Sequence, residues 1–255
     1  MAKKSEAESL MKLAIFSDIH GNLPALEAVL ADVKSHDVDA VYCLGDLVGY
    51  APFPNEVVDR IRRERIPTIM GNYDDGVGFD RNECGCAYRE PEEKARGDRS
   101  LAWTKAHTTA ENKAFLQTLH HELRFEANGK RVLLVHGSPR KINEYLFEDR
   151  PPSSFERLAA ASNADVIVYG HTHKPYTKLL KDVLFVNVGS LGKPKDGDWR
   201  ACYALLEPGA SEPVRFVRVE YDHKRVTDAI RRSDLPQEFA ADLETGGAPL
   251  RSVAR

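Results

Sequence analysis

Hydrophobic residues along the first third of the chain form short continuous runs that alternate with helical periodicity. An apolar run at 13–16 precedes the segment 23–33, in which apolar residues recur at the spacing of one helix face. Further apolar runs at 40–46 and 67–72 enclose a second helical segment at 55–66. This order of elements predicts parallel strands with helical crossovers, and strands that are apolar throughout indicate that both faces are covered.

Five further apolar runs in the second half of the chain each predict a strand. They lie at 130–138, 164–173, 182–190, 201–207 and 214–222. Two helical patterns at 98–107 and 110–121 precede them, and two more at 225–233 and 236–244 follow. The chain is therefore predicted to be an α/β protein.

The segment 73–100 interrupts this pattern because it is polar, charged and rich in glycine. A structureless segment of that length within a domain is usually an active-site lid or is disordered, and we interpret it as a lid loop. It falls within a single predicted domain at 13–243. A flexible N-terminus at 1–12 precedes this domain, and a disordered tail at 244–255 follows it.

The composition excludes some classes of partner. With 36 basic and 39 acidic residues, the chain has a net charge of −3, which does not suggest a protein that coats nucleic acid or an anionic membrane. No apolar run approaches the roughly 18 residues that span a bilayer. The first residues also lack the apolar stretch of a signal peptide. We expect a cytoplasmic protein without stable contacts to nucleic acid or membrane, and the oligomeric state stays open.

Two of the four cysteines form a close pair. Cys43 and Cys202 lie in apolar runs and are predicted to be buried, whereas Cys84 and Cys86 lie in the polar segment. This pair is compatible with half of a zinc site or with a local disulfide, but no second close pair would complete four zinc ligands. We favour packing of the loop over a metal or redox role.

Side chains with metal-binding chemistry stand where five of the predicted strands end. Asp18 and His20 follow the first strand, and residues two apart in an extended segment point to the same side. The others are Asp46, Asn72, His136, His171 and His173. Ligands bind at the carboxyl ends of strands in open α/β sheets, so we expect these side chains to meet. Each alone is compatible with a helix cap or a turn, but together they indicate a metal site.

The number and type of these ligands indicate two metal ions. Oxygen and imidazole ligands suit manganese, iron, nickel, cobalt or zinc, and seven ligands are too many for one ion. Two ions about 3.5–4 Å apart are the arrangement that activates a water molecule and holds a phosphoryl group. We therefore predict two divalent transition-metal ions, with manganese favoured, and a small phosphorylated substrate.

The motifs DIH, GDLVG, GN, HG and GHTH, in this order and spacing, resemble those of the calcineurin-like metallophosphoesterase superfamily, most closely its small bacterial and archaeal phosphodiesterases. The resemblance covers residues 13–220. It implies a four-layer α/β/β/α sandwich with two central mixed sheets flanked by helices. It also implies the ligand sets: Asp18, His20 and His173 for one ion, and Asn72, His136 and His171 for the other, with Asp46 as the bridge.

On this resemblance we expect an enzyme that hydrolyses a small phosphodiester or nucleotide. A metal-bridging hydroxide would attack phosphorus in line, and Asp46, Asn72 and His136 would be catalytic. Hydrolysis of a dinucleoside polyphosphate or a phosphomonoester is one alternative. A non-catalytic metal-binding scaffold is another, although the filled ligand positions favour an enzyme.

Three further residues are candidate substrate contacts. Arg140 and Tyr145 closely follow His136 and are placed to meet a substrate phosphate. Tyr73 stands where many members of the superfamily have a histidine that protonates the leaving group. Tyrosine is the poorer acid at neutral pH, so we expect a strong dependence on the leaving group. Whether Tyr73 or Asp74 takes part in catalysis stays open.

Overall fold

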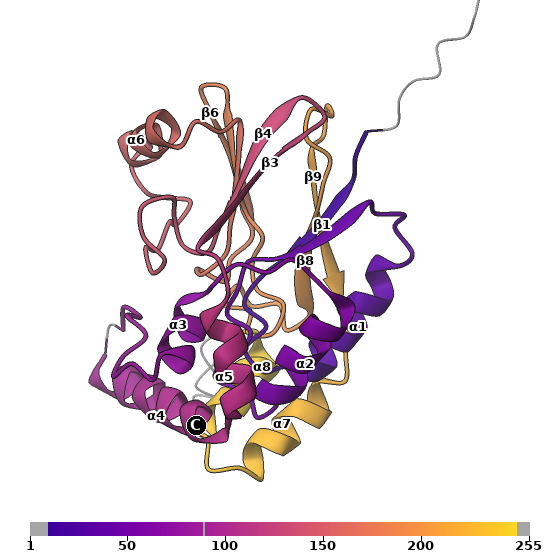
Figure 1. The fold of residues 1–255 in the computed structure, drawn as a ribbon. Helices are drawn as coiled ribbons and strands as arrows, with labels where there is room; N and C mark the ends of the chain where they lie inside the picture. The colour runs from indigo at the N-terminus through magenta and orange to yellow at the C-terminus, as the bar shows by residue number, and fades with distance from the viewer. Residues whose placement is uncertain (1–9, 89, 249–255) are drawn as a thin grey trace, which may run out of the picture.

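The computed structural model describes residues 10–88 and 90–248 (Figure 1). The strands in this part of the chain are β1 Leu13–Phe16, β2 Ala40–Cys43, β3 Glu122–Ala127, β4 Lys130–Val135, β5 Val166–Tyr169, β6 Tyr176–Leu180, β7 Val183–Asn187, β8 Ala201–Leu206 and β9 Val214–Val219. The helices are α1 Leu23–Val33, α2 Pro54–Glu64, α3 Asn72–Gly78, α4 Pro91–His107, α5 Ala110–Gln117, α6 Pro152–Ser162, α7 His223–Arg231 and α8 Glu238–Thr245. Within the described ranges, no helix is long and apolar enough to cross a membrane.

The strands form two mixed sheets. The four-stranded sheet has the order β2-β1-β8-β9, in which β1 runs parallel to β2 and antiparallel to β8. The five-stranded sheet has the order β3-β4-β5-β7-β6. Its three inner strands are parallel, and each outer strand is antiparallel to its neighbour. The predicted α/β fold with two mixed sheets is confirmed.

Alternate residues of the inner strands face different layers. Leu13 and Ile15 of β1 pack between the two sheets, whereas Ala14 and Phe16 face the helices outside the four-stranded sheet. Residues of β4 and β5 alternate in the same way between the layer shared by the sheets and the layer beneath α6. Helices α1, α2, α7 and α8 therefore cover one side of the paired sheets and α6 covers the other (Figure 1).

The connection from β1 to α1 is short because Asn22 caps the helix. Its Oδ1 accepts a hydrogen bond from the Ala25 amide at 3.2 Å, and Pro24 occupies the first helical turn. The loop 17–21 is thereby held between the end of a sheet strand and the start of a helix. This loop carries Asp18 and His20.

Residues 73–100 are not the structureless segment that the sequence predicts. Helix α3 begins at Asn72 and α4 begins at Pro91, so of the described residues in this segment only 79–88 and 90 lie outside helices. The start of α4 escapes prediction because the helix buries mostly small or polar residues and shows little hydrophobic periodicity. That the segment 73–100 acts as a lid stays a prediction.

Three other elements differ from the prediction. The segment 67–72 forms only isolated bridges, at Thr68 and Ile69, instead of a full strand. Helix α5 ends at Gln117, four residues earlier than the predicted 121. The edge strands β3 and β6 were not predicted, because each has several exposed polar residues and no continuous apolar run.

At both ends of the described chain, ordered structure extends into segments that the sequence predicts to be flexible. Met11 exchanges two hydrogen bonds with Asn128, at 2.7 and 3.1 Å, although it lies in the expected flexible N-terminus. Thr245 belongs to α8, and Gly246 ends this helix in a left-handed conformation. The remaining residues of the two predicted flexible ends, 1–9 and 249–255, lie outside the described residues. A single domain over 13–243 stays a prediction.

Candidate metal centre

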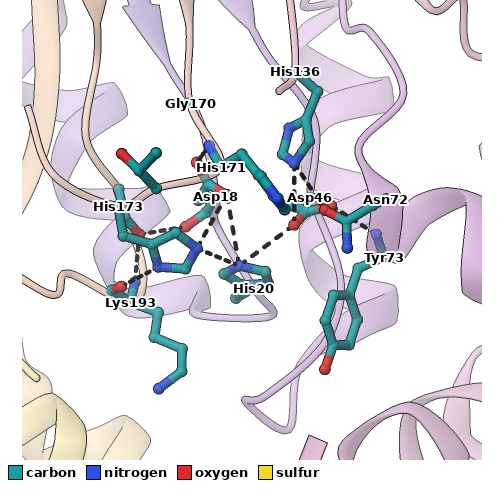
Figure 2. Close-up of polar contacts among 12 residues, drawn as sticks. Asp18, His20, Asp46, Asn72, Tyr73, His136, Gly170, His171, His173 and Lys193 are labelled. Atoms are coloured by element: carbon teal, nitrogen blue, oxygen red, sulfur yellow. Dashed lines mark hydrogen bonds and ion pairs between the residues drawn. The ribbon is translucent and has the colours of Figure 1, made fainter. Parts of the chain in front are cut away.

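The seven predicted ligands lie together beyond the carboxyl ends of strands from both sheets (Figure 2). Five of them, all except Asn72 and His136, have a backbone φ between 51° and 64°. This left-handed conformation is uncommon for residues other than glycine and persists where the surrounding structure enforces it. Backbone hydrogen bonds enforce it here: the Asp18 amide donates to the Gly45 carbonyl at 3.0 Å, and the His20 amide donates to the Asp46 carbonyl at 2.9 Å.

Asp18, His20 and His173 form the first ligand group. Asp18 Oδ1 lies 3.2 Å from His173 Nε2 and 3.7 Å from His20 Nε2. The Nε2 atoms of the two imidazoles are 3.3 Å apart. All three side chains are buried. One carboxylate and two imidazoles thus face a common point inside the protein, and these donors suit a divalent transition metal.

Asp46, His136 and His171 form the second ligand group. Their ligand atoms all lie within 4.8 Å of one another, with Asp46 Oδ2 3.4 Å from His136 Nε2. Asn72 adjoins this group, because its Oδ1 lies 3.0 Å from His136 Nε2. Asp46 Oδ2 also lies 3.6 Å from His20 Nε2. The same carboxylate therefore contacts an imidazole of each group.

Backbone carbonyls fix the orientation of three ligand imidazoles. Nδ1 of His20 donates to the Val48 carbonyl at 3.1 Å, and Nδ1 of His136 donates to the Leu44 carbonyl at 2.8 Å. Nδ1 of His173 donates to the Lys193 carbonyl. In a neutral imidazole this leaves Nε2 without a proton and turned toward the site.

Unprotonated, unpaired ligand atoms explain why these residues fit a metal ion. Nε2 of His20 and Nε2 of His173 cannot bond to each other when both rings are neutral, since neither carries a proton there. Asp18 Oδ1 and His171 Nε2 are buried, and within the described chain they make no hydrogen bond. Buried acceptors left unpaired are costly; a cation in the first ligand group would satisfy Asp18, His20 and His173, and a cation in the second would satisfy His171.

Burial and neighbouring charges set the protonation of the imidazoles. Burial, reinforced by a neighbouring imidazole, lowers the pKa of His20 and of His171 to about 3. Burial also lowers the pKa of His173. His136 is the exception: burial opposes its charge, but the Asp46 carboxylate raises the pKa of His136 to about 10. Three imidazoles are therefore neutral at physiological pH, and a cation that binds His136 must displace its proton.

Asp74 supports the site and was not predicted to do so. Its fully buried carboxylate accepts hydrogen bonds from the amides of Asp46 at 2.7 Å, Leu47 at 2.9 Å and Gly71 at 3.0 Å. The loops that carry Asp46 and Asn72 approach so closely that a Cβ at Gly71 would collide with Asp46 Oδ1. In the sequence Asp74 is not distinguishable from its partly buried neighbour Asp75, because the structural role depends on the folded loops.

A cavity of about 1090 Å³ adjoins the second ligand group. Tyr145 lines this cavity, and its ring centroid lies 4.0 Å from that of His171. Aromatic and basic side chains form much of the lining: Tyr50, Tyr88, Phe147, Tyr176, Phe239, Arg96, Lys174, Lys178, Lys193 and Lys195. Four acidic side chains, Glu93, Glu148, Asp149 and Asp242, share this lining, so the cavity offers flat apolar surfaces and charges of both signs close to the metal ligands.

Two predicted substrate contacts do not lie on this cavity. Tyr73 is fully buried, and its ring packs 4.8 Å from that of Tyr50 and edge-on against the ring of the ligand His20, at 5.4 Å (Figure 2). Arg140 is exposed and pairs with Glu144. That these two residues bind substrate stays a prediction, although one is enclosed by packing and the other is paired with a neighbouring carboxylate. Tyr145 is the only one of the three predicted contacts that lines the described cavity.

Comparison with known proteins identifies close similarity over most of the chain. A sequence profile of the calcineurin-like phosphoesterase superfamily domain matches residues 11–210. The chain is 33% identical over 252 residues to the uncharacterized protein MJ0912 of Methanocaldococcus jannaschii, covering 92% of this chain and 98% of that protein. It is 27% identical over 208 residues to the phosphodiesterase YfcE of Escherichia coli K12, covering 78% and 88%.

Solved structures show the same fold. The crystal structure of a metallophosphoesterase from Sphaerobacter thermophilus is 31% identical in sequence, with a TM-score of 0.75, and covers 93% of this chain and all of that one. The hypothetical protein PH1004 from Pyrococcus horikoshii is 24% identical, with a TM-score of 0.82 and 94% of this chain covered. The ligand-bearing loops thus belong to a fold that is found in a metallophosphoesterase.

Proposed function

The chain belongs to the calcineurin-like phosphoesterase superfamily and is a phosphoric ester hydrolase, and from this we propose that it cleaves a small phosphodiester or nucleotide with two divalent metal ions. The observation that carries the proposal is the position of Asp46. Its Oδ2 lies 3.6 Å from His20 in the first ligand group and 3.4 Å from His136 in the second. A carboxylate shared between two ligand groups is suited to bridge two ions.

The proposed division of ligands follows the two groups. Asp18, His20 and His173 would hold one ion, Asn72, His136 and His171 would hold the other, and Asp46 would contact both. When bound, the two ions would polarise the phosphoryl group and lower the pKa of a water molecule that acts as the nucleophile.

The protein contributes orientation to this chemistry. The carbonyls of Val48, Leu44 and Lys193 hold three imidazoles with Nε2 turned inward. The Tyr73 amide donates to Asp46 Oδ1 at 2.8 Å, which leaves Oδ2 directed at the two groups. The ligands are thus held in place by backbone atoms, and this reduces the reorganisation needed when ions and substrate bind.

The lining of the adjoining cavity supports an aromatic phosphodiester as the substrate. Base-sized rings stack favourably on tyrosine and phenylalanine, typically by about 1–3 kcal/mol per ring. Tyr145 connects this aromatic wall to His171 at the metal centre. Lysine side chains of the cavity would attract the negative charge of the phosphate. The relative YfcE is named a phosphodiesterase, which supports the same class of ester.

The test is a panel of esters with a panel of ions. Full-length protein stripped of metal would be reconstituted in turn with manganese, nickel, cobalt, zinc and magnesium, and assayed on bis(p-nitrophenyl) phosphate, p-nitrophenyl phosphate and a dinucleoside polyphosphate. We expect the diester to be cleaved fastest, with manganese the best ion. His171→Gln should lower metal content and turnover, whereas the matched control His121→Gln changes an exposed imidazole and should affect neither.

Each other outcome points to one of the alternatives. Turnover of the monoester alone, or of the dinucleoside polyphosphate alone, would replace the proposed substrate class. Two tightly bound ions with no turnover of any ester would support a metal-binding scaffold. Equal effects of His171→Gln and His121→Gln would contradict the assignment of the ligands.

A further inference from the structure

Cys84 and Cys86 lie directly beside the metal centre as a pair of thiols. Both are free cysteines, and their sulfur atoms are 3.0 Å apart. Gly85 between them has a φ of +67°, a left-handed conformation that turns the chain sharply and brings the two side chains to the same side. Asn143 holds this turn by donating to the Gly85 carbonyl at 2.9 Å. The fold therefore keeps two thiols within reach of each other.

The thiol pair is connected to a proposed metal ligand. The Asn72 amide nitrogen donates to the Cys84 carbonyl at 3.0 Å and contacts Cys86 Sγ at 3.3 Å. The other polar atom of the same side chain, Asn72 Oδ1, lies 3.0 Å from His136 Nε2. The orientation of the Asn72 side chain thus depends on the positions of the two cysteines.

A small molecule can reach one member of the pair. A second cavity, of about 530 Å³, is open to the surface and is lined by Asn72, Cys84, Gly85 and Asn143. Both cysteines are partly buried, but Cys86 does not belong to the lining of this cavity. By contrast, Cys43 and Cys202 are buried in the core.

From this arrangement we infer that Cys84 and Cys86 form a reversible disulfide bond with each other when a low-molecular-weight disulfide such as glutathione disulfide oxidises them. We infer also that this oxidation weakens metal binding through Asn72. The first part concerns the thiols alone. The second part rests on the proposed function, because it requires Asn72 to be a ligand.

The accessible thiol reacts first. The Cys84 thiolate attacks one sulfur of glutathione disulfide, and one glutathione leaves and takes up the proton lost by Cys84. The Cys86 thiolate then attacks the Cys84 sulfur of the mixed disulfide, and the second glutathione leaves with the proton from Cys86. The protein loses two electrons and two protons, and glutathione disulfide is reduced to two glutathione molecules.

Oxidation changes the surroundings of Asn72. A disulfide bond requires the two sulfurs to approach to about 2.05 Å, closer than the two thiols lie now. The Asn72 amide would then lose its present contact with the Cys86 thiol. Loss of a partner that orients a metal ligand typically lowers metal affinity by about 10–100-fold, and we expect an effect near the lower end because the Cys84 carbonyl remains.

The experiment titrates the full-length protein with glutathione and glutathione disulfide in varied ratios. Intact mass and the count of free thiols report the disulfide, peptide mapping locates it, and manganese affinity is measured on the reduced and oxidised forms. We expect loss of two of the four thiols, a bond between Cys84 and Cys86, recovery with excess glutathione, and about tenfold weaker manganese binding.

Single variants distinguish the roles of the two thiols. Cys86→Ala should accumulate a mixed disulfide of Cys84 with glutathione, whereas Cys84→Ala should be modified more slowly because Cys86 does not line the open cavity. The control Cys202→Ser changes a buried thiol and should oxidise like the unaltered protein.

Two results would overturn the inference separately. Four free thiols at every glutathione ratio would exclude the disulfide. A disulfide that forms but leaves manganese affinity unchanged would exclude the connection through Asn72. A protein that forms the disulfide but cleaves no ester would contradict the proposed function and leave the thiol chemistry standing.

Discussion

Asp74 provides a sharp test of how the metal-binding loops are held. Its carboxylate is fully buried and accepts three backbone hydrogen bonds, from Asp46 and Gly71 at Oδ2 and from Leu47 at Oδ1. These bonds join the loop after β2, which carries Asp46, to the first turn of α3, which carries Asn72. Removing the carboxylate should therefore loosen two proposed ligands at once.

The expected loss of stability follows from the number of donors left unpaired. Asp74→Ala leaves three buried N–H groups without an acceptor, at about 1–3 kcal/mol each, or about 3–9 kcal/mol in total. Proteins of this kind are usually stable by about 5–15 kcal/mol, so the variant should be severely destabilised. Asp74→Asn keeps one acceptor oxygen, which can serve the two donors at the Oδ2 position, and should lose about 1–3 kcal/mol.

Electrostatics reduces the loss for the amide variant. Burial and the charge of Asp46 raise the pKa of Asp74 to about 7. At pH 8 the carboxylate is therefore mostly ionised, and Asp74→Asn also removes a repulsion from Asp46. Asp74→Ala removes the same repulsion, so the relief lowers both losses alike and the difference between the two variants follows the bond count.

The assay is denaturant unfolding of metal-free protein, analysed by linear extrapolation. Asp75→Asn is the matched control because Asp75 pairs at the surface with Arg81, and such pairs contribute at most about 1 kcal/mol. A free energy of unfolding for Asp74→Ala within about 1 kcal/mol of the unaltered protein would refute the reasoning. Equal losses in Asp74→Ala and Asp75→Asn would refute it as well.

Four further predictions concern the site directly. Asp46→Asn should reduce metal content and diester turnover more than any other single ligand change, because both ions lose a shared negative charge; retention of two ions and near-normal turnover would contradict this. Tyr73→Phe should lower turnover far less than the about 10²–10⁴-fold typical of a lost general acid, since the ring is enclosed and the hydroxyl makes no hydrogen bond within the described chain. Manganese affinity should rise about tenfold per pH unit between about pH 7 and pH 9, because the raised pKa of His136 makes metal binding release one proton. Calorimetry at several pH values should show that this slope vanishes in His136→Asn. A manganese affinity that does not change with pH in the unaltered protein would contradict the prediction. The same raised pKa predicts that the His136–Asp46 pair stabilises metal-free protein below about pH 6.5 and that this contribution is lost as the pH rises through about 10.

The sequence predicts which side chains gather in the two candidate ligand groups because most of them belong to short motifs that follow a strand. Asp18 and His20 follow β1, and His171 and His173 follow β5, so the order of strands brings them to one edge. What the motifs do not contain is the left-handed backbone of five ligands. That conformation arises from hydrogen bonds to loops distant in sequence, such as the bond from the His20 amide to Asp46.

The elements that escape prediction lack a hydrophobic period. Edge strands β3 and β6 expose several side chains, and α4 buries a glycine, a serine and a threonine beside a single leucine. Tyr73 illustrates the same limit at the site. Its place next to a ligand indicates a substrate contact, but the side chain is enclosed by packing against Tyr50, which only the folded structure shows.

The central claim is that Asp46 and the two ligand groups together hold two ions that cleave a phosphodiester. The most direct measurement is the metal content of the protein, titrated with manganese from the metal-free state, together with the rate of bis(p-nitrophenyl) phosphate hydrolysis in the same samples. The account predicts that turnover appears as the manganese content approaches about two ions per chain. It also predicts that Asp46→Asn abolishes both the binding of two ions and the turnover. Full turnover at one ion per chain, or saturation at two ions without any hydrolysis, would contradict it.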